Sequence, residues 1–159
     1  MLLRRAMETD LDAILSLYTE AIGREGCVWN DEYPGANFLQ SDFKAGDLFV
    51  LLDEDEMIGA VSLEQEREYD DLAEFAITDE TEREIARVVI AKKHSGKGLA
   101  AKMLQLLFDK LKDQGIRGIR LSVAACNEAA MRTYKKLGFQ FLTFAKLYGG
   151  EYWVCEKVL

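Results

Sequence analysis

The chain has 159 residues, of which 49% are hydrophobic and 30% are charged, and its net charge is −8. This length suits one domain, residues 1–159, with a core that buries about 70% of the unfolded surface. The negative charge argues against nucleic acid as the main partner. No apolar run approaches the roughly 18 residues of a membrane span and no signal peptide is recognisable, so we expect a cytoplasmic protein without a membrane partner.

Cysteine and histidine are too few and too scattered for a metal site or a disulfide framework. The three cysteines, Cys27, Cys126 and Cys155, lack the paired spacing of metal ligands, and His94 is the single histidine. We therefore expect free thiols in a reducing compartment and no bound metal.

The spacing of apolar residues predicts strands and helices along the whole chain. We expect Thr9 to cap the first helix, with Asp12 at the capping-box position. The polar segment 64–81 gives no clear assignment. The predicted strands cover residues 2–6, 47–52, 57–63, 84–90, 117–124, 140–148 and 151–158, and the predicted helices cover 10–23, 35–44, 99–114 and 128–137.

A strand, a cationic glycine loop and a helix follow one another between residues 84 and 114. Gly96 and Gly98 let a ligand approach the backbone closely, and Lys97 adds positive charge. The first amides of the helix that begins at Leu99 have no internal partner, and the helix dipole adds roughly half a positive charge there. The pattern indicates an anion cradle suited to a phosphate or pyrophosphate, with a plain strand-to-helix turn as the simpler interpretation.

Two nucleotide-binding motifs fit this loop less well. A Walker loop needs Ser or Thr after Gly-Lys, whereas Gly98 follows Lys97 here. A dinucleotide fingerprint needs an acidic residue about 20 positions further on, whereas the next strand ends in Ala125-Cys126-Asn127. The cradle also follows residue 90 of a short chain, which leaves no room for a doubly wound sheet behind it.

Two segments match motifs of a known family. The first, Ser95-Gly96-Lys97-Gly98-Leu99-Ala100, is similar to the coenzyme-binding motif Arg/Gln-x-x-Gly-x-Gly/Ala, with Ser95 replacing the leading Arg or Gln. The second, from Asn127 to Phe139, is similar to the signature Asn-x-x-Ala-x-x-x-Tyr-x-x-x-Gly-Phe. Through both segments the chain resembles the Gcn5-related N-acetyltransferase (GNAT) superfamily.

The resemblance implies an α+β fold: a twisted, mostly antiparallel mixed sheet, helices on both faces, and two central strands that splay apart to admit the coenzyme. It implies direct transfer of an acetyl group from acetyl-CoA to an amine on a small molecule or peptide, without a metal, and leaves a homodimer open. The alternatives are a catalytically silent acyl-CoA binding or sensing module and a nucleotide-phosphate binding domain.

The same resemblance gives Tyr134 the role of general acid, which protonates the leaving thiolate; the alternative is a core tyrosine. Glu84 matches the base glutamate of histone-type members, and strand periodicity places it on the same face as Val88 and Ile90. Its alternatives are a solvated carboxylate or a base that acts through water.

The remaining site residues are also implied by the resemblance. Trp29 and Tyr33 are expected to line the acceptor pocket, or else to plug the edge of the core. The expected coenzyme-binding residues are Val88, Val89, Ile90, Ser95, Gly96, Lys97, Gly98, Leu99, Ala100 and Asn127.

An acidic run precedes the central strand. Fourteen carboxylates lie between Asp53 and Glu84, against Arg67 and Arg83 alone. Such a run commonly forms a solvated hairpin and loop. The alternative is a negative rim that attracts cationic acceptors.

Overall fold

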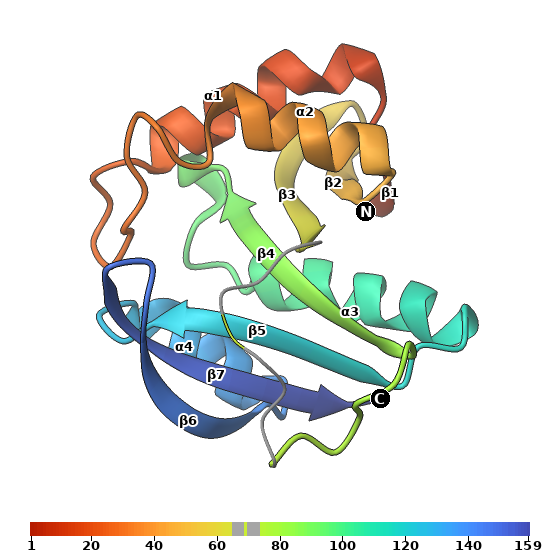
Figure 1. The fold of residues 1–159 in the computed structure, drawn as a ribbon. Helices are drawn as coiled ribbons and strands as arrows, with labels where there is room; N and C mark the ends of the chain where they lie inside the picture. The colour runs from red at the N-terminus through yellow and green to blue at the C-terminus, as the bar shows by residue number, and fades with distance from the viewer. Residues whose placement is uncertain (65–68, 70–73) are drawn as a thin grey trace.

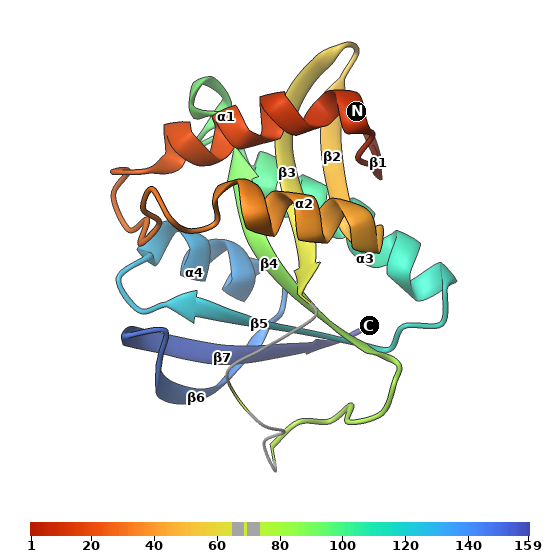
Figure 2. The same cartoon turned by 45° about the horizontal axis from the view of Figure 1, so that its top comes forward.

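The computed structural model describes residues 1–64, 69 and 74–159, and these form a seven-stranded sheet covered by helices on both faces (Figure 1). Figures 1 and 2 show α1 and α2 on one face and α3 and α4 on the other, which confirms the predicted fold class. The elements are β1 (Leu2–Arg5), the 3-10 helix η1 (Glu8–Asp10), α1 (Leu11–Ala21), α2 (Gly35–Ala45), β2 (Leu48–Asp53), β3 (Glu56–Glu64), β4 (Glu82–Ile90), the 3-10 helix η2 (Lys92–His94), α3 (Leu99–Asp113), β5 (Gly118–Ala124), α4 (Glu128–Lys136), β6 (Gln140–Leu147) and β7 (Gly150–Val158).

The strand order is β1-β2-β3-β4-β5-β7-β6, and β4 and β5 are the parallel pair within it. Their pairing covers only Glu82–Glu84 against Gly118–Arg120. Beyond this point β4 continues to Ile90 and β5 to Ala124 without pairing with each other, and Figure 1 shows the two strands diverging. The predicted splay of the two central strands is therefore confirmed.

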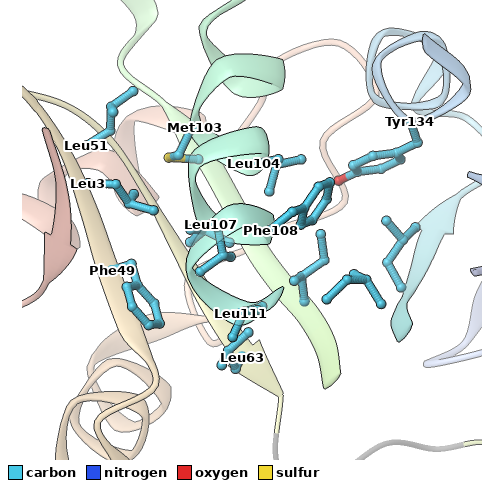
Figure 3. Packing of buried hydrophobic residues seen from close by; sticks show 14 of the residues in the cluster. Leu3, Phe49, Leu51, Leu63, Met103, Leu104, Leu107, Phe108, Leu111 and Tyr134 are labelled. Atoms are coloured by element: carbon cyan, nitrogen blue, oxygen red, sulfur yellow. The ribbon is translucent and has the colours of Figure 1, made fainter. Parts of the chain in front are cut away.

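The apolar core lies on both faces of the sheet. On one face, α3 presents a stripe of buried side chains at helical spacing, including Met103, Leu107 and Leu111, to the sheet (Figure 3). On the other face, Ile14 and Tyr18 of α1 pack over β2, β3 and β4. These two layers hold the diverging ends of β4 and β5 in place from both sides.

The predicted cap of the first helix is wrong. The Asp10 carboxylate, not Thr9, accepts the Met7 amide at 2.7 Å, and it also pairs with the Arg4 guanidinium at 2.6 Å. These contacts stabilise a 3-10 turn at residues 8–10, so α1 begins at Leu11 and Asp12 lies in its first turn instead of in a capping box.

The last two strands form the predicted hairpin, with its turn one residue earlier than the glycine pair suggests. Tyr148 and Gly149 both have positive φ, 51° and 74°, and Leu147 pairs with Gly150. Two central residues with positive φ give the turn that matches the twist of a hairpin. The segment 64–81, which the sequence left unassigned, lies partly outside the described residues.

Candidate active site

The gap between β4 and β5 leaves backbone groups of β4 without a neighbouring strand. The Ala91 amide donates to Ile58 of β3 at 2.8 Å, so the groups of Ile90 point the opposite way, toward β5. The Ile90 carbonyl accepts a hydrogen bond from Arg24 at 2.8 Å. An extended ligand in this gap has a strand edge to pair with, in the manner of an added strand.

A β-bulge interrupts β4 within this region. Ala60 pairs with Val89 and Ser62 pairs with Ala86, so Val61 faces two residues of β4 instead of one. Arg87, one of those two residues, has a φ of 51°. The bulge turns the backbone at the place where the strand edge meets the gap.

The bulge also overturns the predicted orientation of Glu84. Ile85, Val88 and Ile90 pack on the α3 face, whereas Val89 packs on the α1 face. The extra residue changes the alternation, so Glu84 lies on the face opposite Val88 and Ile90.

Glu84 is not a solvated carboxylate. It is 5% exposed and accepts a hydrogen bond from the Tyr69 hydroxyl at 2.7 Å. It lies directly across from Glu64 on β3. The carboxylate therefore belongs to the buried polar groups of the α1–α2 side of the sheet.

The predicted anion cradle has the expected backbone form. Gly96 and Gly98 have φ of 76° and 73°, and Gly98 directly precedes α3. A Cβ added at either glycine would meet nothing within 4 Å, so both positions border open space. The Lys102 amide donates to the Gly98 carbonyl, which leaves the three preceding helical amides without an intrahelical acceptor.

Tyr134 projects from α4 into the apolar cluster under α3, as Figure 3 shows. It is 8% exposed, and its ring meets that of Phe139 edge to face at 5.6 Å. Burial raises the pKa of Tyr134 above its usual value, and nearby Cys155 adds to the shift. The phenol therefore stays protonated at neutral pH, as a proton donor must.

The structure divides the predicted site residues between the two faces of the sheet. Ile90 and Tyr134 belong to the α3-side apolar cluster, with Val88, Leu99 and Ala100 packed against it. On the opposite face lie Glu84 and the aromatic residues of the α1–α2 connection. The unpaired parts of β4 and β5 lie between the two sets.

Asn127 caps α4 as predicted, since its side chain accepts the Ala130 amide at 3.2 Å. It lies at the end of β5, where the chain segment before α2 also arrives: a Cβ added at Gly26 would be 2.9 Å from the Cα of Asn127. The segment between α1 and α2 thus reaches across the open end of the gap to the start of α4.

Trp29 and Tyr33 play different parts in that segment. The Trp29 ring meets Tyr18 of α1 at 5.4 Å and is partly buried in the α1-side cluster. The Tyr33 hydroxyl accepts a hydrogen bond from Arg87 at 3.2 Å, and burial raises the pKa of Tyr33. A cavity of about 260 Å³ between α1 and this segment is lined partly by Tyr18 and Pro34.

Sequence reasoning missed the buried ion pair between Arg87 and Asp42 of α2. Both side chains are nearly inaccessible, at 0% and 4% exposure, and the contact has two parallel hydrogen bonds of 2.8 Å. The signal was an arginine inside the apolar strand sequence Ile85-Ala86-Arg87-Val88-Val89. A charged residue at such a position needs a buried partner.

Two further findings concern the described residues alone. They contain no group of three or more side chains that could hold a metal ion. Among them, too, no helix is both long enough and apolar enough to cross a membrane.

Comparison with known proteins identifies the family. The model of the Acetyltransferase (GNAT) family matches residues 11–139. The chain belongs to this family. The match extends from α1 through the cradle and the Tyr134 helix to Phe139, so it includes both segments that carry the sequence resemblance.

Relatives and solved structures of N-acetyltransferases support the same conclusion. The chain is 36% identical over 98 residues to N-alpha-acetyltransferase 30 of Schizosaccharomyces pombe, which covers 57% of this chain and 55% of that protein. It is 29% identical over 144 residues to the L-amino acid N-acyltransferase MnaT of Escherichia coli, covering 87% and 79%. The chain thus spans only about half the length of the first relative.

The fold is shared with solved acetyltransferase structures. A GNAT-family acetyltransferase of Streptococcus agalactiae superposes with a TM-score of 0.84 at 22% identity, covering 99% of this chain and 95% of that one. The yncA protein of Salmonella typhimurium, solved with its cofactor acetyl-CoA, gives 0.74 at 21% identity, covering 99% and 93%. These likenesses establish the fold.

Proposed function

We propose that this protein is an acetyl-CoA-dependent N-acetyltransferase that transfers the acetyl group directly to a primary amine. The observation that supports the proposal is the gap between β4 and β5, with the glycine cradle at one end and Tyr134 beside it. An extended acyl thioester with a pyrophosphate suits this arrangement: the cradle would bind the pyrophosphate, the edge of β4 the extended arm, and Tyr134 would face the thioester.

The residues present fit acetyl-CoA. Gly96 and Gly98 border open space at the start of α3, where backbone amides and Lys97 suit a pyrophosphate. In the proposal, backbone groups of Val88 and Ile90 bind the pantetheine arm, and so does the Asn127 side chain. Bound acetyl-CoA supplies an electrophilic acyl carbon and a thiolate leaving group.

In the proposed reaction, the bulged backbone near Val89 donates an amide hydrogen to the acyl carbonyl and stabilises the negative charge that develops there. Tyr134 then gives its proton to the departing thiolate. Because burial raises the pKa of Tyr134, this proton is present throughout the neutral range. The acid therefore works from the α3–α4 side of the gap.

The proposed base acts from the other face. Four residues separate Glu84 from Val88, a span of about 13 Å at about 3.3 Å per strand residue. A glutamate side chain does not bridge that length, so we propose that Glu84 receives the amine proton through water. Of the interpretations open at the sequence level, we therefore propose the base that acts through water.

The acceptor we propose is the α-amine of an amino acid or peptide. A lysine-type amine has a pKa near 10.4, so about one molecule in 10³ is unprotonated at pH 7, whereas a peptide α-amine with a pKa near 8 is about one tenth unprotonated. A base that is distant and acts through water suits a peptide α-amine better than a lysine-type amine, because more of the α-amine is already unprotonated. The names of the relatives, an L-amino acid N-acyltransferase and an N-alpha-acetyltransferase, also point to α-amines.

Thiol release from acetyl-CoA tests the proposal, with amino acids, short peptides, polyamines and aminoglycosides as acceptors. We expect turnover with α-amines and, in calorimetry, a higher affinity for CoA than for NAD or ATP. CoA binding without turnover on any acceptor would instead support the silent binding module. Preferential binding of NAD or ATP would support the nucleotide domain.

A further inference from the structure

Arg87 is the charged residue at the bulge of β4. Its side chain is fully buried, at 0% exposure, and its φ is 51°. Residues with a Cβ seldom adopt this region, and a buried guanidinium is unfavourable unless it is paired. The position therefore combines two costly features at the point where β4 borders the gap.

Groups from three segments converge on the Arg87 guanidinium. Asp42 of α2 accepts two hydrogen bonds, from Nε and Nη2, each at 2.8 Å. Nη1 donates to Glu64 of β3 at 2.7 Å and to the Tyr33 hydroxyl at 3.2 Å. The ring of Phe38 lies 5.3 Å from the guanidinium carbon. The bidentate contact fixes both the distance and the plane of the guanidinium.

Packing alone does not require these polar contacts of the Arg87 guanidinium. An apolar side chain of similar volume commonly replaces a buried ion pair without loss of stability. What an apolar side chain lacks is a directional link between the bulge and α2. Because Asp42 lies on a helix that packs across the α1-side face, its carboxylate is a rigid anchor for β4.

We propose that Arg87 is a positioning residue: its pairing with Asp42 holds the bulge so that the amide of Val88 points at the acyl carbonyl in the gap. The inference rests on the proposed function. Arg87 touches neither coenzyme nor acceptor and acts through the backbone of its neighbours. Its contact with Tyr33 joins the same anchor to the segment proposed to line the acceptor pocket.

Steady-state kinetics of Asp42→Asn test this role, since the variant keeps the side-chain shape and removes the charge and one acceptor. Because a small misplacement of a donor is costly in rate, we expect kcat to fall about 10- to 100-fold. The KM for acetyl-CoA should stay within about twofold, since the cradle is unaffected. Arg87→Lys should lose part of the rate, because an ammonium cannot make the bidentate contact.

A matched control exists in the pair of Arg4 and Asp10, which is also bidentate, at 2.6 and 3.1 Å, and lies in the β1–η1 region. Asp10→Asn should lower the melting temperature without changing kcat at 25 °C. If Asp42→Asn behaves like Asp10→Asn, with reduced stability and normal kcat, the pair is only structural and the proposal fails.

A second measurement remains informative if no acceptor is found. In protein labelled with ¹⁵N-valine, the amide resonance of Val88 should shift more with acetyl-CoA than with CoA. Asp42→Asn should abolish that difference while CoA still binds with wild-type affinity. Equal shifts with both ligands in the wild-type protein would overturn the positioning role, whereas missing turnover alone would count against the proposed function.

Discussion

The Glu56 carboxylate contacts Nε2 of His94 at 2.8 Å and also pairs with Lys93, which joins the β2–β3 turn to the loop before α3. Lys93 and, to a lesser degree, His94 lower the pKa of Glu56 to about 2. The tip of the acidic run between Asp53 and Glu84 therefore lies beside the proposed phosphate cradle, where its negative charge opposes the lysines.

Removal of that charge should strengthen coenzyme binding. In Glu56→Gln, Lys93 is released toward the proposed pyrophosphate site, and we expect the Kd for CoA to fall about two- to threefold at low salt. The difference should vanish near 0.5 M salt, because exposed charges are screened beyond a few ångströms there. Titration calorimetry at two salt concentrations measures it.

Asp55→Asn is the control for Glu56→Gln, since it changes the same net charge within the same turn. An equal gain in CoA affinity in both variants would mean that the turn acts through its overall electrostatic field and not through the contact between Glu56 and Lys93. No gain in either would mean that Lys93 does not reach the coenzyme.

The cradle itself is tested by Gly98→Ala. A Cβ at this position meets no protein atom within 4 Å, so the cost to the fold arises from the positive φ of 73° alone. The same Cβ points into the proposed pyrophosphate position, and we expect the Kd for CoA to rise at least about tenfold, since each factor of ten needs only about 1.4 kcal/mol. Calorimetry provides the measurement.

Gly115→Ala is a matched control at the other end of α3. Gly115 also has a positive φ, 85°, and open space around its missing Cβ. Both variants should lose similar stability, and only Gly98→Ala should lose CoA affinity. If the two variants bind CoA equally well, the loop from Ser95 to Ala100 is not the phosphate site.

The proposed acid is tested by Tyr134→Phe, which removes one hydroxyl and little volume. If Tyr134 protonates the thiolate, kcat should fall about 10²- to 10⁴-fold while the Kd for CoA hardly changes. Tyr148→Phe, at an exposed position in the β6–β7 turn, is the control. Normal kcat in Tyr134→Phe, under conditions in which chemistry limits the rate, would remove this role.

The sequence predicted those parts of the fold that local chemistry specifies. Apolar periodicity placed the strands and helices, and positive φ at Gly96 and Gly98 follows from the absence of a Cβ. The splay was predicted through the family resemblance. Local patterns do not encode which strand neighbours which, so the partners of each strand could not be derived from periodicity alone.

The errors at Glu84 and Thr9 have one physical origin. Strand alternation assumes an unbroken pleat, and a single extra residue at Arg87 moves Glu84 to the other face. Capping preferences assume a helix that starts with an α turn, whereas here a 3-10 turn over Glu8–Asp10 comes first, and the Asp10 carboxylate, held by Arg4, caps it. In both places the local backbone conformation depends on a contact with a side chain that is distant in sequence or belongs to another element.

Cysteine reactivity separates the buried and exposed thiols. Cys155 is buried on β7, and burial raises its pKa to about 12, so almost no thiolate exists at pH 8. Cys126 is exposed at the end of β5. Brief iodoacetamide treatment followed by mass spectrometry should modify Cys126 and leave Cys155 unmodified until denaturant is added. Early alkylation of Cys155 in the native protein would contradict the packing of β7.

The last prediction concerns the alkaline limit of stability and the buried Tyr18 hydroxyl. Tyr18 is 2% exposed, and its hydroxyl lies close to Ser62 without forming a hydrogen bond. Burial raises the pKa of Tyr18 from 10 to about 12. In the unfolded chain the phenol ionises from about pH 10, whereas the folded protein keeps it neutral to about pH 12. This group therefore contributes stability that is fully present below pH 10 and is lost as the pH rises toward 12.

Tyr18→Phe removes both the ionisation and an unpaired buried hydroxyl. Near pH 8 we expect the variant to be as stable as the wild type or more stable by about 1 kcal/mol, because a buried donor without a partner is unfavourable. Between pH 10 and 12 the difference in free energy of unfolding should grow in favour of the variant, by up to about 2 to 3 kcal/mol, since a shift of one pKa unit corresponds to about 1.4 kcal/mol. Urea unfolding from pH 8 to 11 follows the onset of this change, with Tyr148→Phe as the exposed control. A Tyr18→Phe curve parallel to the wild type over this range would show that the hydroxyl reaches solvent or a partner in the folded protein.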